Sequence, residues 1–354
     1  KPSGITSRVD MKVLFLTSSP PPEIPGTDAV FEELVALAGA VDGKIVHLHP
    51  FASPARRFPM AAMGLARLPG ILKLAAHCDV VHVFNPGLYA FPFLRLVSKP
   101  VIYTVSASLP PSFSIRDAQF FKRLAAIVVS NARDDEILTQ QGLANIQRVK
   151  PGHDLSQFAK LRDKPKRKAG PRFRLLSASA PWTLSQFETK GIDALLEAVS
   201  ISDRLEATLV MRGSFRETAT RKAEALSITD RMTILDGAQD IATHMAEADC
   251  AILAASTPEV VKAWPHSLLE ALAAGRPVIT SRQLPIADFV AETGCGTVMD
   301  AISGEAVVKA AEFIAADMPT YRSAAERFSW QDFSPQTMVD SYMALYGMAA
   351  AKQP

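Results

Sequence analysis

The sequence predicts an α/β protein built from two open, parallel β-sheets, each in its own domain. Short apolar runs alternate with helix patterns, and this alternation is typical of parallel sheets covered by helices. The alternation stops once, in the basic stretch Lys160–Arg174, and then starts again. A chain of 354 residues is long enough for two such domains. We expect ligands at the carboxyl ends of the strands, in a cleft between the domains.

The first half is predicted to alternate strands and helices from residue 11 onward. Strands are expected at Lys12–Ser18, Lys44–His49, Asp79–Phe84, Pro100–Val105, Ala125–Ser130 and Ile146–Lys150. Thr27 should cap a helix that runs to about Ala38, and Asn131 should cap the helix Ala132–Gln140. No Gly-x-Gly-x-x-Gly pattern follows the first strand, so a dinucleotide site for hydride transfer is disfavoured.

The second half repeats the pattern. Strands are expected at Phe173–Ala178, Ala207–Gly213, Met232–Leu235, Cys250–Ala254, Pro277–Thr280 and Gly296–Met299. Helices are expected at Gly191–Ile201, Thr218–Leu226, Asp240–Glu247, Ser303–Asp317, Pro319–Arg327 and Pro335–Ala350. We therefore predict a first domain over residues 11–160, a basic linker over 161–172 and a second domain over 173–334. Residues 1–10 have no apolar core and are interpreted as a cloning remnant or an unstructured leader.

The stretch Lys262–Ser281 carries the clearest local pattern. Ser267 is a good N-cap, and Glu270 three residues later has the spacing of a capping box. Gly275 and Pro277 should end the helix. Such a helix start suits an anion like a phosphate, and a carboxylate in its first turn can accept hydrogen bonds from sugar hydroxyls. The alternative is that Glu270 only caps the helix.

Composition excludes several classes of function. A net charge of +2 gives no field that would favour nucleic acid. The three cysteines are scattered, so neither a disulfide framework nor a zinc site is supported, and a cytoplasmic setting is expected. Asp134-Asp135 lies at a helix start and is interpreted as complementing the helix dipole, not as a metal site.

Several segments, taken together, resemble one family. KVLFLTSSPPPEIPGTDAVFEELVALA, DVVHVFNP, IVVSNARDDEILTQQGL, TKGIDALLEAV and PHSLLEALAAGRPVIT follow the order and spacing of GT-B retaining glycosyltransferases that use nucleotide sugars, the family 4-like group. The resemblance implies two Rossmann-like domains facing a cleft, with the last helix, about residues 335–354, packed back on the first. It implies sugar transfer from a nucleotide-diphosphate sugar to a sugar, lipid-linked or small-molecule acceptor, with retention and with no metal or cofactor.

The resemblance also implies roles for individual residues. Glu270 matches a glutamate that binds the nucleotide ribose, and Lys190-Gly191 matches a Lys-Gly pair whose lysine neutralises the donor diphosphate. The alternative for Lys190 is an exposed lysine before a helix. Further donor contacts are expected from Ser267, Leu268, Leu269, Arg212, Gly213, Ser214, Gly26 and Thr27. Cleft or acceptor contacts are expected from His153, Ser106 and Asn85, of which His153 could equally be a turn residue.

Three positions depart from the family pattern. Lys262 stands where the family has the first of two glutamates, and Ser106 stands where many members have a histidine. Ser177–Trp182 stands where the family commonly has Gly-Arg, so Arg212 or Lys262 could supply the missing charge. The enzyme interpretation is preferred. The alternative is a degenerate GT-B subunit that binds a nucleotide or glycan without transferring a sugar.

Residues 55–74 mix arginines with apolar side chains and could lie on an anionic bilayer, at the inner face of a membrane. Pro59 and Pro69 interrupt any long amphipathic helix there. A partly buried helix and loop is therefore the preferred interpretation.

Overall fold

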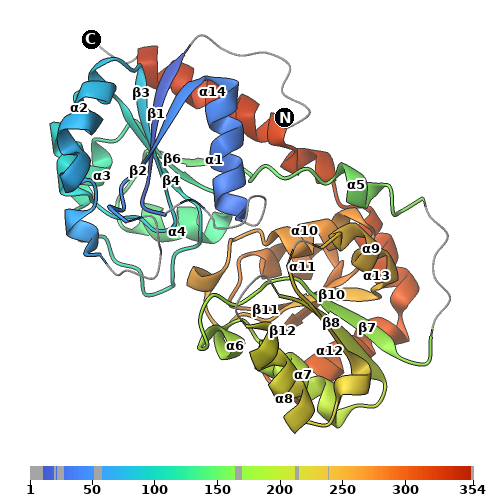
Figure 1. Ribbon diagram of the computed structural model, residues 1–354. Coiled ribbons are helices and arrows are strands. Elements are labelled where there is room, and N and C mark those ends of the chain that lie inside the picture. Colours follow the sequence, from blue (N-terminus) through green and yellow to red (C-terminus); the bar gives the residue numbers. More distant parts are fainter. Residues whose placement is uncertain are drawn as a thin grey trace. The chain divides into compact units, whose positions relative to one another are not determined.

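The computed structural model describes residues 11–19, 21, 28–51, 58–163, 170–211, 215–237 and 239–351. The chain forms two compact units, one of residues 1–153 with 332–354 and the other of Asp154–Gln331 (Figure 1). Each unit contains one six-stranded parallel sheet, so the predicted α/β class is confirmed. The chain passes between the units at His153–Asp154, ahead of the predicted linker. Arg162, expected in that linker, belongs to the second unit.

The first sheet has the strand order β2-β1-β3-β4-β5-β6, and every pairing is parallel. Its strands are β1 (Lys12–Thr17), β2 (Asp42–His47), β3 (Val80–Asn85), β4 (Val101–Val105), β5 (Ala126–Val129) and β6 (Ile146–Arg148). Four of the six, β1, β3, β4 and β5, bury most or all of their side chains, which explains why their sequences read as continuous apolar runs.

Helices cover both faces of this sheet (Figure 1). They are α1 (Ala29–Ala40), α2 (Leu68–Ala76), α3 (Ala118–Lys122), α4 (Ala132–Gln140) and α14 (Pro335–Ala351). On one face, Val13 and Phe15 of β1 pack with α1 and α14. On the other, Leu14 and Leu16 pack with α2, α3 and α4. Alternate residues of β1 therefore serve two separate cores.

The last helix is bonded into the first unit through a buried histidine. His82 of β3 lies within hydrogen-bond distance of the Tyr346 hydroxyl, at 2.6 Å, and of the Thr104 hydroxyl, at 2.7 Å. Thr104 in turn bonds the Tyr342 hydroxyl at 2.9 Å. Burial without a charged partner lowers the pKa of His82 to about 3. The neutral ring thus ties α14 to β3 and β4.

The second sheet has the order β12-β11-β10-β7-β8-β9 and is also fully parallel. Its strands are β7 (Phe173–Ser177), β8 (Leu205–Val210), β9 (Met232–Leu235), β10 (Cys250–Leu253), β11 (Val278–Ser281) and β12 (Gly296–Met299). The accompanying helices are α5 (Ser156–Ala159), α6 (Gln186–Thr189), α7 (Ile192–Ile201), α8 (Arg216–Ala225), α9 (Ile241–Glu247), α10 (His266–Ala273), α11 (Ile286–Thr293), α12 (Gly304–Ala316) and α13 (Met318–Glu326). Helices α7, α8 and α12 pack on one face, while α9, α10 and α11 contact β7, β10 and β11 (Figure 1).

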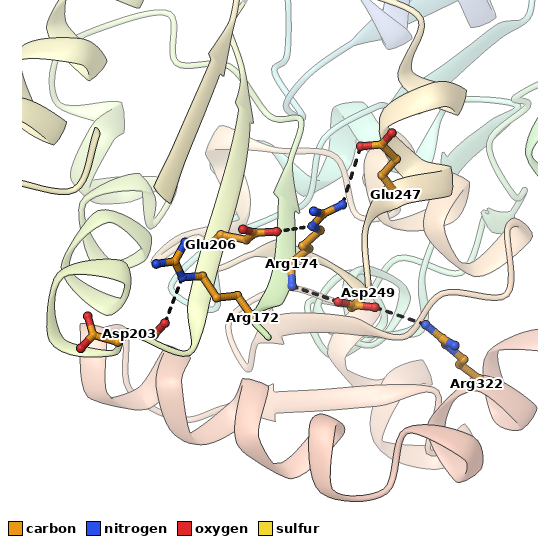
Figure 2. Close-up of polar contacts among 7 residues, drawn as sticks. All are labelled: Arg172, Arg174, Asp203, Glu206, Glu247, Asp249 and Arg322. Atoms are coloured by element: carbon orange, nitrogen blue, oxygen red, sulfur yellow. Dashed lines mark hydrogen bonds and ion pairs between the residues drawn. The ribbon is translucent and has the colours of Figure 1, made fainter. Parts of the chain in front are cut away.

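Ion pairs join the amino ends of the strands in the second unit (Figure 2). The Arg174 guanidinium on β7 pairs with Glu206 on β8 and lies 3.8 Å from Glu247 on α9. Asp249, just before β10, accepts the Arg174 backbone amide at 3.1 Å and pairs with Arg322 of α13 at 3.4 Å. These groups are partly exposed, so each pair contributes little alone. They mark the end of the sheet away from the candidate site.

No helix bounds were predicted for α2, α3, α5, α6 and α11. Pro69 lies in the first turn of α2, where a proline is tolerated, so the helix begins at Leu68 and runs on past the proline. Helix α11 ends at Gly294, which adopts the left-handed conformation typical of a helix end. Short 3₁₀ helices lie at Met60–Ala62, Leu65–Arg67, Pro92–Leu96, Thr229–Arg231, Pro258–Val260 and Trp330–Phe333. Among the helices described, none combines the length and hydropathy needed to cross a bilayer.

Candidate functional site

Each sheet has a point where the strand order reverses, and the predicted site residues gather near these points. In the first sheet β1 lies between β2 and β3, and in the second β7 lies between β8 and β10. Ligands of open parallel sheets bind outside the carboxyl ends of the strands at such points. Ser18 and Asn85 lie there in the first unit. In the second unit, the loops after β7 and β10 lie there.

Lys190 is a buried lysine in the loop region after β7. The residue is 5% exposed, and its Nζ donates a hydrogen bond to the Ala180 carbonyl at 2.7 Å. Among the described carboxylates none forms an ion pair with it, and burial lowers its pKa to about 8. The lysine is thus neither exposed nor neutralised, which argues against the alternative of an exposed lysine before a helix. It is suited to bind an anion.

Gly191 fixes the backbone beside this lysine. Its φ of +72° lies in the left-handed region, where glycine carries no steric penalty. An added Cβ would lie 2.3 Å from the carbonyl oxygen of Ala254, which directly follows β10. The Ser256 amide donates to the Thr189 carbonyl at 2.9 Å. Because Gly191 has no side chain, the turn at Lys190 can pack against the loop after β10.

Helix α10 begins two residues earlier than predicted. Pro265 is its N-cap, with extended backbone and no side-chain cap, so the predicted capping box of Ser267 and Glu270 is wrong. The amides of Leu268 and Leu269 donate to the Pro265 carbonyl at 3.0 and 3.1 Å. The prediction that those two amides bind a diphosphate is therefore not supported. His266 and Ser267 precede them, in the first turn, where the helix itself offers no acceptor.

The other end of α10 is closed in two ways. The Arg276 amide donates to Ala271 and the Gly275 amide donates to Leu272, which is a Schellman motif with Gly275 at φ +68°. Arg162 then donates to the carbonyls of Ala273 at 2.6 Å and Leu272 at 3.0 Å. It also donates to the carbonyl of Glu326, the last residue of α13, and to that of Phe328 just after the helix. A guanidinium at a helix carboxyl end complements the dipole. The predicted end of the helix is confirmed.

In the first unit, Asn85 and Ser106 lie at adjacent strand ends. Asn85, the last residue of β3, accepts a hydrogen bond from the Ser18 hydroxyl and donates to the Gly87 carbonyl at 2.7 Å. Its own carbonyl accepts the Ser106 amide at 2.9 Å. The Ser106 hydroxyl is buried and bonds none of the described residues. The structure thus brings two of the predicted cleft residues together.

Asp134 has a role that the sequence did not reveal. It is 1% exposed and accepts hydrogen bonds from the Leu109 amide at 3.0 Å, the Ser108 hydroxyl at 3.2 Å and the Asn131 side-chain amide at 2.6 Å. Burial raises the pKa of this carboxyl. It fixes the loop after β4 as well as complementing the α4 dipole. The Asn-x-x-Asp spacing at a helix start was the only available signal.

Comparison with known proteins bears directly on the second unit. Residues 184–328 match the family model for Glycosyl transferases group 1. The chain is 31% identical over 119 residues to the lipopolysaccharide glucosyltransferase WaaG of Escherichia coli. That match covers 32% of this chain and 31% of the relative, so it spans about a third of the relative's length.

Two solved structures resemble the whole chain. HepE of Anabaena in complex with UDP has a TM-score of 0.69 at 15% identity, covering 95% of this chain and 100% of that one. The crystal structure of WaaG has a TM-score of 0.57 at 17% identity, covering 96% and 98%. At these identities the likeness concerns the fold. The predicted GT-B architecture of two Rossmann-like domains is confirmed.

The remaining predicted residues have different outcomes. Glu270 lies past the first turn of α10 and is 9% exposed. Lys262, in the loop before α10, is half-buried. His153 is half-buried, and its amide donates to the Phe333 carbonyl at 2.7 Å. Gly26, Thr27, Arg212, Gly213 and Ser214 lie outside the described residues. The roles assigned to all these residues remain predictions.

The segment proposed for membrane contact contributes to the core. Of residues 55–74, the structure describes those from 58 onward. Met63 and Ile71 are buried in the first-unit core, and Phe58, Met60 and Leu68 pack against it. This agrees with the preferred interpretation of a partly buried helix and loop. The three cysteines are free and buried, as expected for a chain without a disulfide framework.

Proposed function

We propose that this chain is a glycosyltransferase that moves a sugar from a nucleotide-diphosphate sugar to an acceptor hydroxyl. The observation that supports this most directly is Lys190, a buried lysine that follows α6, bonds the loop after β7 and has no ion pair among the described residues. It lies in a unit that matches Glycosyl transferases group 1. A cation held in a site of low dielectric stabilises the charge that develops on a departing diphosphate. The residues around it form a fixed turn, so little reorganisation is needed.

The proposed chemistry needs few groups. As the bond between the anomeric carbon and the diphosphate breaks, Lys190 would stabilise the negative charge left on the diphosphate. The amino end of α10 would add its dipole and its first amides, and Glu270 would accept hydrogen bonds from the ribose hydroxyls. An oxygen of the leaving diphosphate can take the acceptor proton on the same face of the sugar. This assignment gives retention of configuration and requires no separate base.

We also propose that the transfer needs no divalent metal, because Lys190 and the α10 terminus supply positive charge at the diphosphate. The expected result is an unchanged rate after exhaustive treatment with EDTA. A rate that falls with EDTA and returns with Mg²⁺ or Mn²⁺ would contradict this part. Retention is tested separately, by NMR of the anomeric proton of the product before mutarotation.

The solved structures indicate which nucleotides to test first. Structures of HepE contain UDP, UDP with glucose, or UDP-glucose, so uridine nucleotides are the first probes. Isothermal titration with UDP, GDP, ADP and TDP should show one clear preference in the parent protein. The Lys190→Met variant should lose at least tenfold in affinity, while the exposed-lysine control Lys309→Met should not change. Absence of binding by every diphosphate would contradict the proposal.

A binding subunit without transfer is the second candidate, and Lys262 favours it. An ammonium stands where the resembling family has a sugar-binding carboxylate, which inverts the local charge. The Lys262→Glu variant separates the two functions. Hydrolysis of a nucleotide sugar gained only in the variant would support the degenerate subunit. Transfer by the parent that the substitution abolishes would support a specialised enzyme.

For the acceptor and the cellular location we propose classes and not a single answer. The relative WaaG is a lipopolysaccharide glucosyltransferase, so a sugar on a glycolipid is one acceptor to test, beside free sugars and small molecules. We propose that the protein acts in the cytoplasm. Peripheral contact with a membrane is a separate proposal. Co-sedimentation with vesicles of anionic and neutral phospholipid tests that contact.

A further inference from the structure

The loop after β7 exposes two large apolar side chains at the candidate donor site. Trp182 is 61% exposed and Leu184 is 65% exposed, the two highest values for large hydrophobic side chains among the described residues. Apolar groups of this size are normally covered in a soluble protein, and an exposed cluster marks a contact surface. The loop therefore presents a surface that nothing in the second unit covers.

The loop is held in this exposing conformation by hydrogen bonds at both of its ends. Before Trp182, the Ala180 carbonyl accepts the Lys190 ammonium at 2.7 Å, and Pro181 is buried. At Trp182 itself, the backbone amide donates to the Gln186 side-chain oxygen at 2.7 Å. After it, the Gln186 amide donates to the Thr183 carbonyl at 3.1 Å. A surface held this way loses little conformational entropy when a ligand binds.

The chemistry of the loop indicates the kind of ligand. Residues 175–187 contain no charged side chain. Thr183 and Ser185 flank Leu184 in sequence and are exposed, and their hydroxyls bond each other at 3.0 Å. A sugar ring combines an apolar C–H face, which an indole can cover, with hydroxyls that bond to such groups. An anionic membrane would instead require lysine or arginine around the apolar pair, and the next charged residue is the acidic Glu188.

We infer that Trp182, with Leu184 and the hydroxyls of Thr183 and Ser185, forms a platform for a neutral pyranose ring beside the diphosphate site. The inference rests on the proposed function, because Lys190 bonds the same loop and would hold the diphosphate next to it. The ring can belong to the donor sugar or to the acceptor. The two sources share one chemistry, and the following measurements separate them.

The test compares the parent with Trp182→Ala and Trp182→Phe. Phe313→Ala, which truncates a 53% exposed aromatic side chain on α12, is the matched control. Binding of UDP and UDP-glucose is measured by calorimetry, and binding of neutral and acidic glycans is measured on a glycan array. We expect Trp182→Ala to leave UDP affinity within twofold and to weaken either UDP-glucose or neutral glycans about tenfold. Trp182→Phe should retain most of the binding, and unchanged thermal midpoints should exclude misfolding.

Each outcome bears on the inference. Loss confined to UDP-glucose assigns the platform to the donor, and loss confined to neutral glycans assigns it to the acceptor. Equal sugar binding by parent and Trp182→Ala overturns the inference, as does a parent that binds no sugar in any arm. Lost co-sedimentation with phosphatidylcholine vesicles, with unchanged sugar binding, would make the loop a membrane contact. Failure of UDP to bind the parent would count against the proposed function, while the glycan array would still test the platform.

Discussion

At the scale of single residues, Lys190 shows how burial prepares a charge for use. A lysine ammonium removed from water without a carboxylate partner is disfavoured, which is why its pKa falls to about 8. The Ala180 carbonyl offsets only part of that penalty, because a neutral acceptor carries no opposing charge. A bound diphosphate would supply the missing negative charge and restore the ordinary pKa.

The first prediction concerns the pH dependence of Lys190. With a pKa of about 8 in the free protein, the lysine is mostly protonated at pH 7 and loses its proton above pH 8. We expect kcat/KM to fall about tenfold per pH unit above pH 8, since the neutral amine cannot stabilise the leaving group. Lys190→Met should lower kcat/KM by about 10² to 10³ at pH 7. A variant with parent-like kinetics and a flat profile would remove Lys190 from the mechanism.

The second prediction concerns Asp134. Replacing it by Asn removes one acceptor from a carboxylate that bonds Leu109, Ser108 and Asn131, and so should loosen the loop after β4. We expect the KM for the acceptor to rise several-fold with unchanged affinity for the nucleotide diphosphate. Asp135→Asn is the matched control, because the Asp135 carboxylate pairs with the exposed Arg148 at 3.3 Å and accepts a hydrogen bond from the Thr139 hydroxyl. Equal kinetics for the two variants would show that the Asp134 network does not position the loop.

At the scale of elements, the contact between the Lys190 turn and the end of β10 depends on a missing Cβ. Gly191 and Gly294 have nearly the same φ, +72° and +67°, but only Gly191 lies against another backbone. The pair therefore separates the energy of the left-handed conformation from the energy of close packing. The contrast leads to the third prediction.

Gly294→Ala should lower the free energy of unfolding of the second unit by about 1 kcal/mol, because nothing lies within 4 Å of its new Cβ. Gly191→Ala should cost roughly 3 kcal/mol or more, since the Cβ would also overlap the Ala254 carbonyl and push the two loops apart. It should also weaken nucleotide binding. Urea denaturation measures the first effect and calorimetry the second. Equal losses for both variants would mean that the turn tolerates displacement.

The elements also show where sequence patterns succeed. Strands were predictable because burial on both faces leaves continuous apolar runs, and β9, β12 and α4 have the bounds expected from the sequence. The start of α10 was misplaced because Pro265 occupies the N-cap, so Ser267, which resembles an N-cap in sequence, lies inside the helix. Local patterns identify that a helix exists more securely than the residue at which it begins.

At the scale of the whole molecule, the sequence located the second-unit site better than the first-unit loop. Lys190, Gly191 and α10 come from short stretches whose neighbours in sequence are also neighbours in space. Asp134 and the loop at Ser108 are 26 residues apart and meet only in the folded unit. The exposed Trp182 gave no periodic signal. Such long-range contacts leave no local pattern, so the sequence could not reveal them.

The fourth prediction concerns acid stability of the first unit. The pKa of His82 is about 3 in the folded protein against 6.5 for an unperturbed histidine, so the unfolded chain binds the proton more readily. The stabilisation is complete above pH 6.5 and is lost as the pH falls towards 3. Between pH 7 and pH 5 we expect a loss of about 2 kcal/mol.

Urea titrations at several pH values measure this effect. The His82→Gln variant should be less stable at neutral pH but should lose less stability on acidification. The control His77→Gln, at the exposed end of α2, should keep the parent's dependence. A parent-like acid dependence in His82→Gln would show that other groups control it.

The chain path through the two units has a consequence for synthesis on the ribosome. The second unit is one continuous segment, so it can fold as soon as residues up to Gln331 have emerged. The first unit waits for α14, because Tyr342 and Tyr346 supply partners for His82 and Thr104. A released chain truncated after Gln331 should therefore resist protease over 154–331 and be digested in its amino-terminal part. The domain that is translated first would be the last to mature.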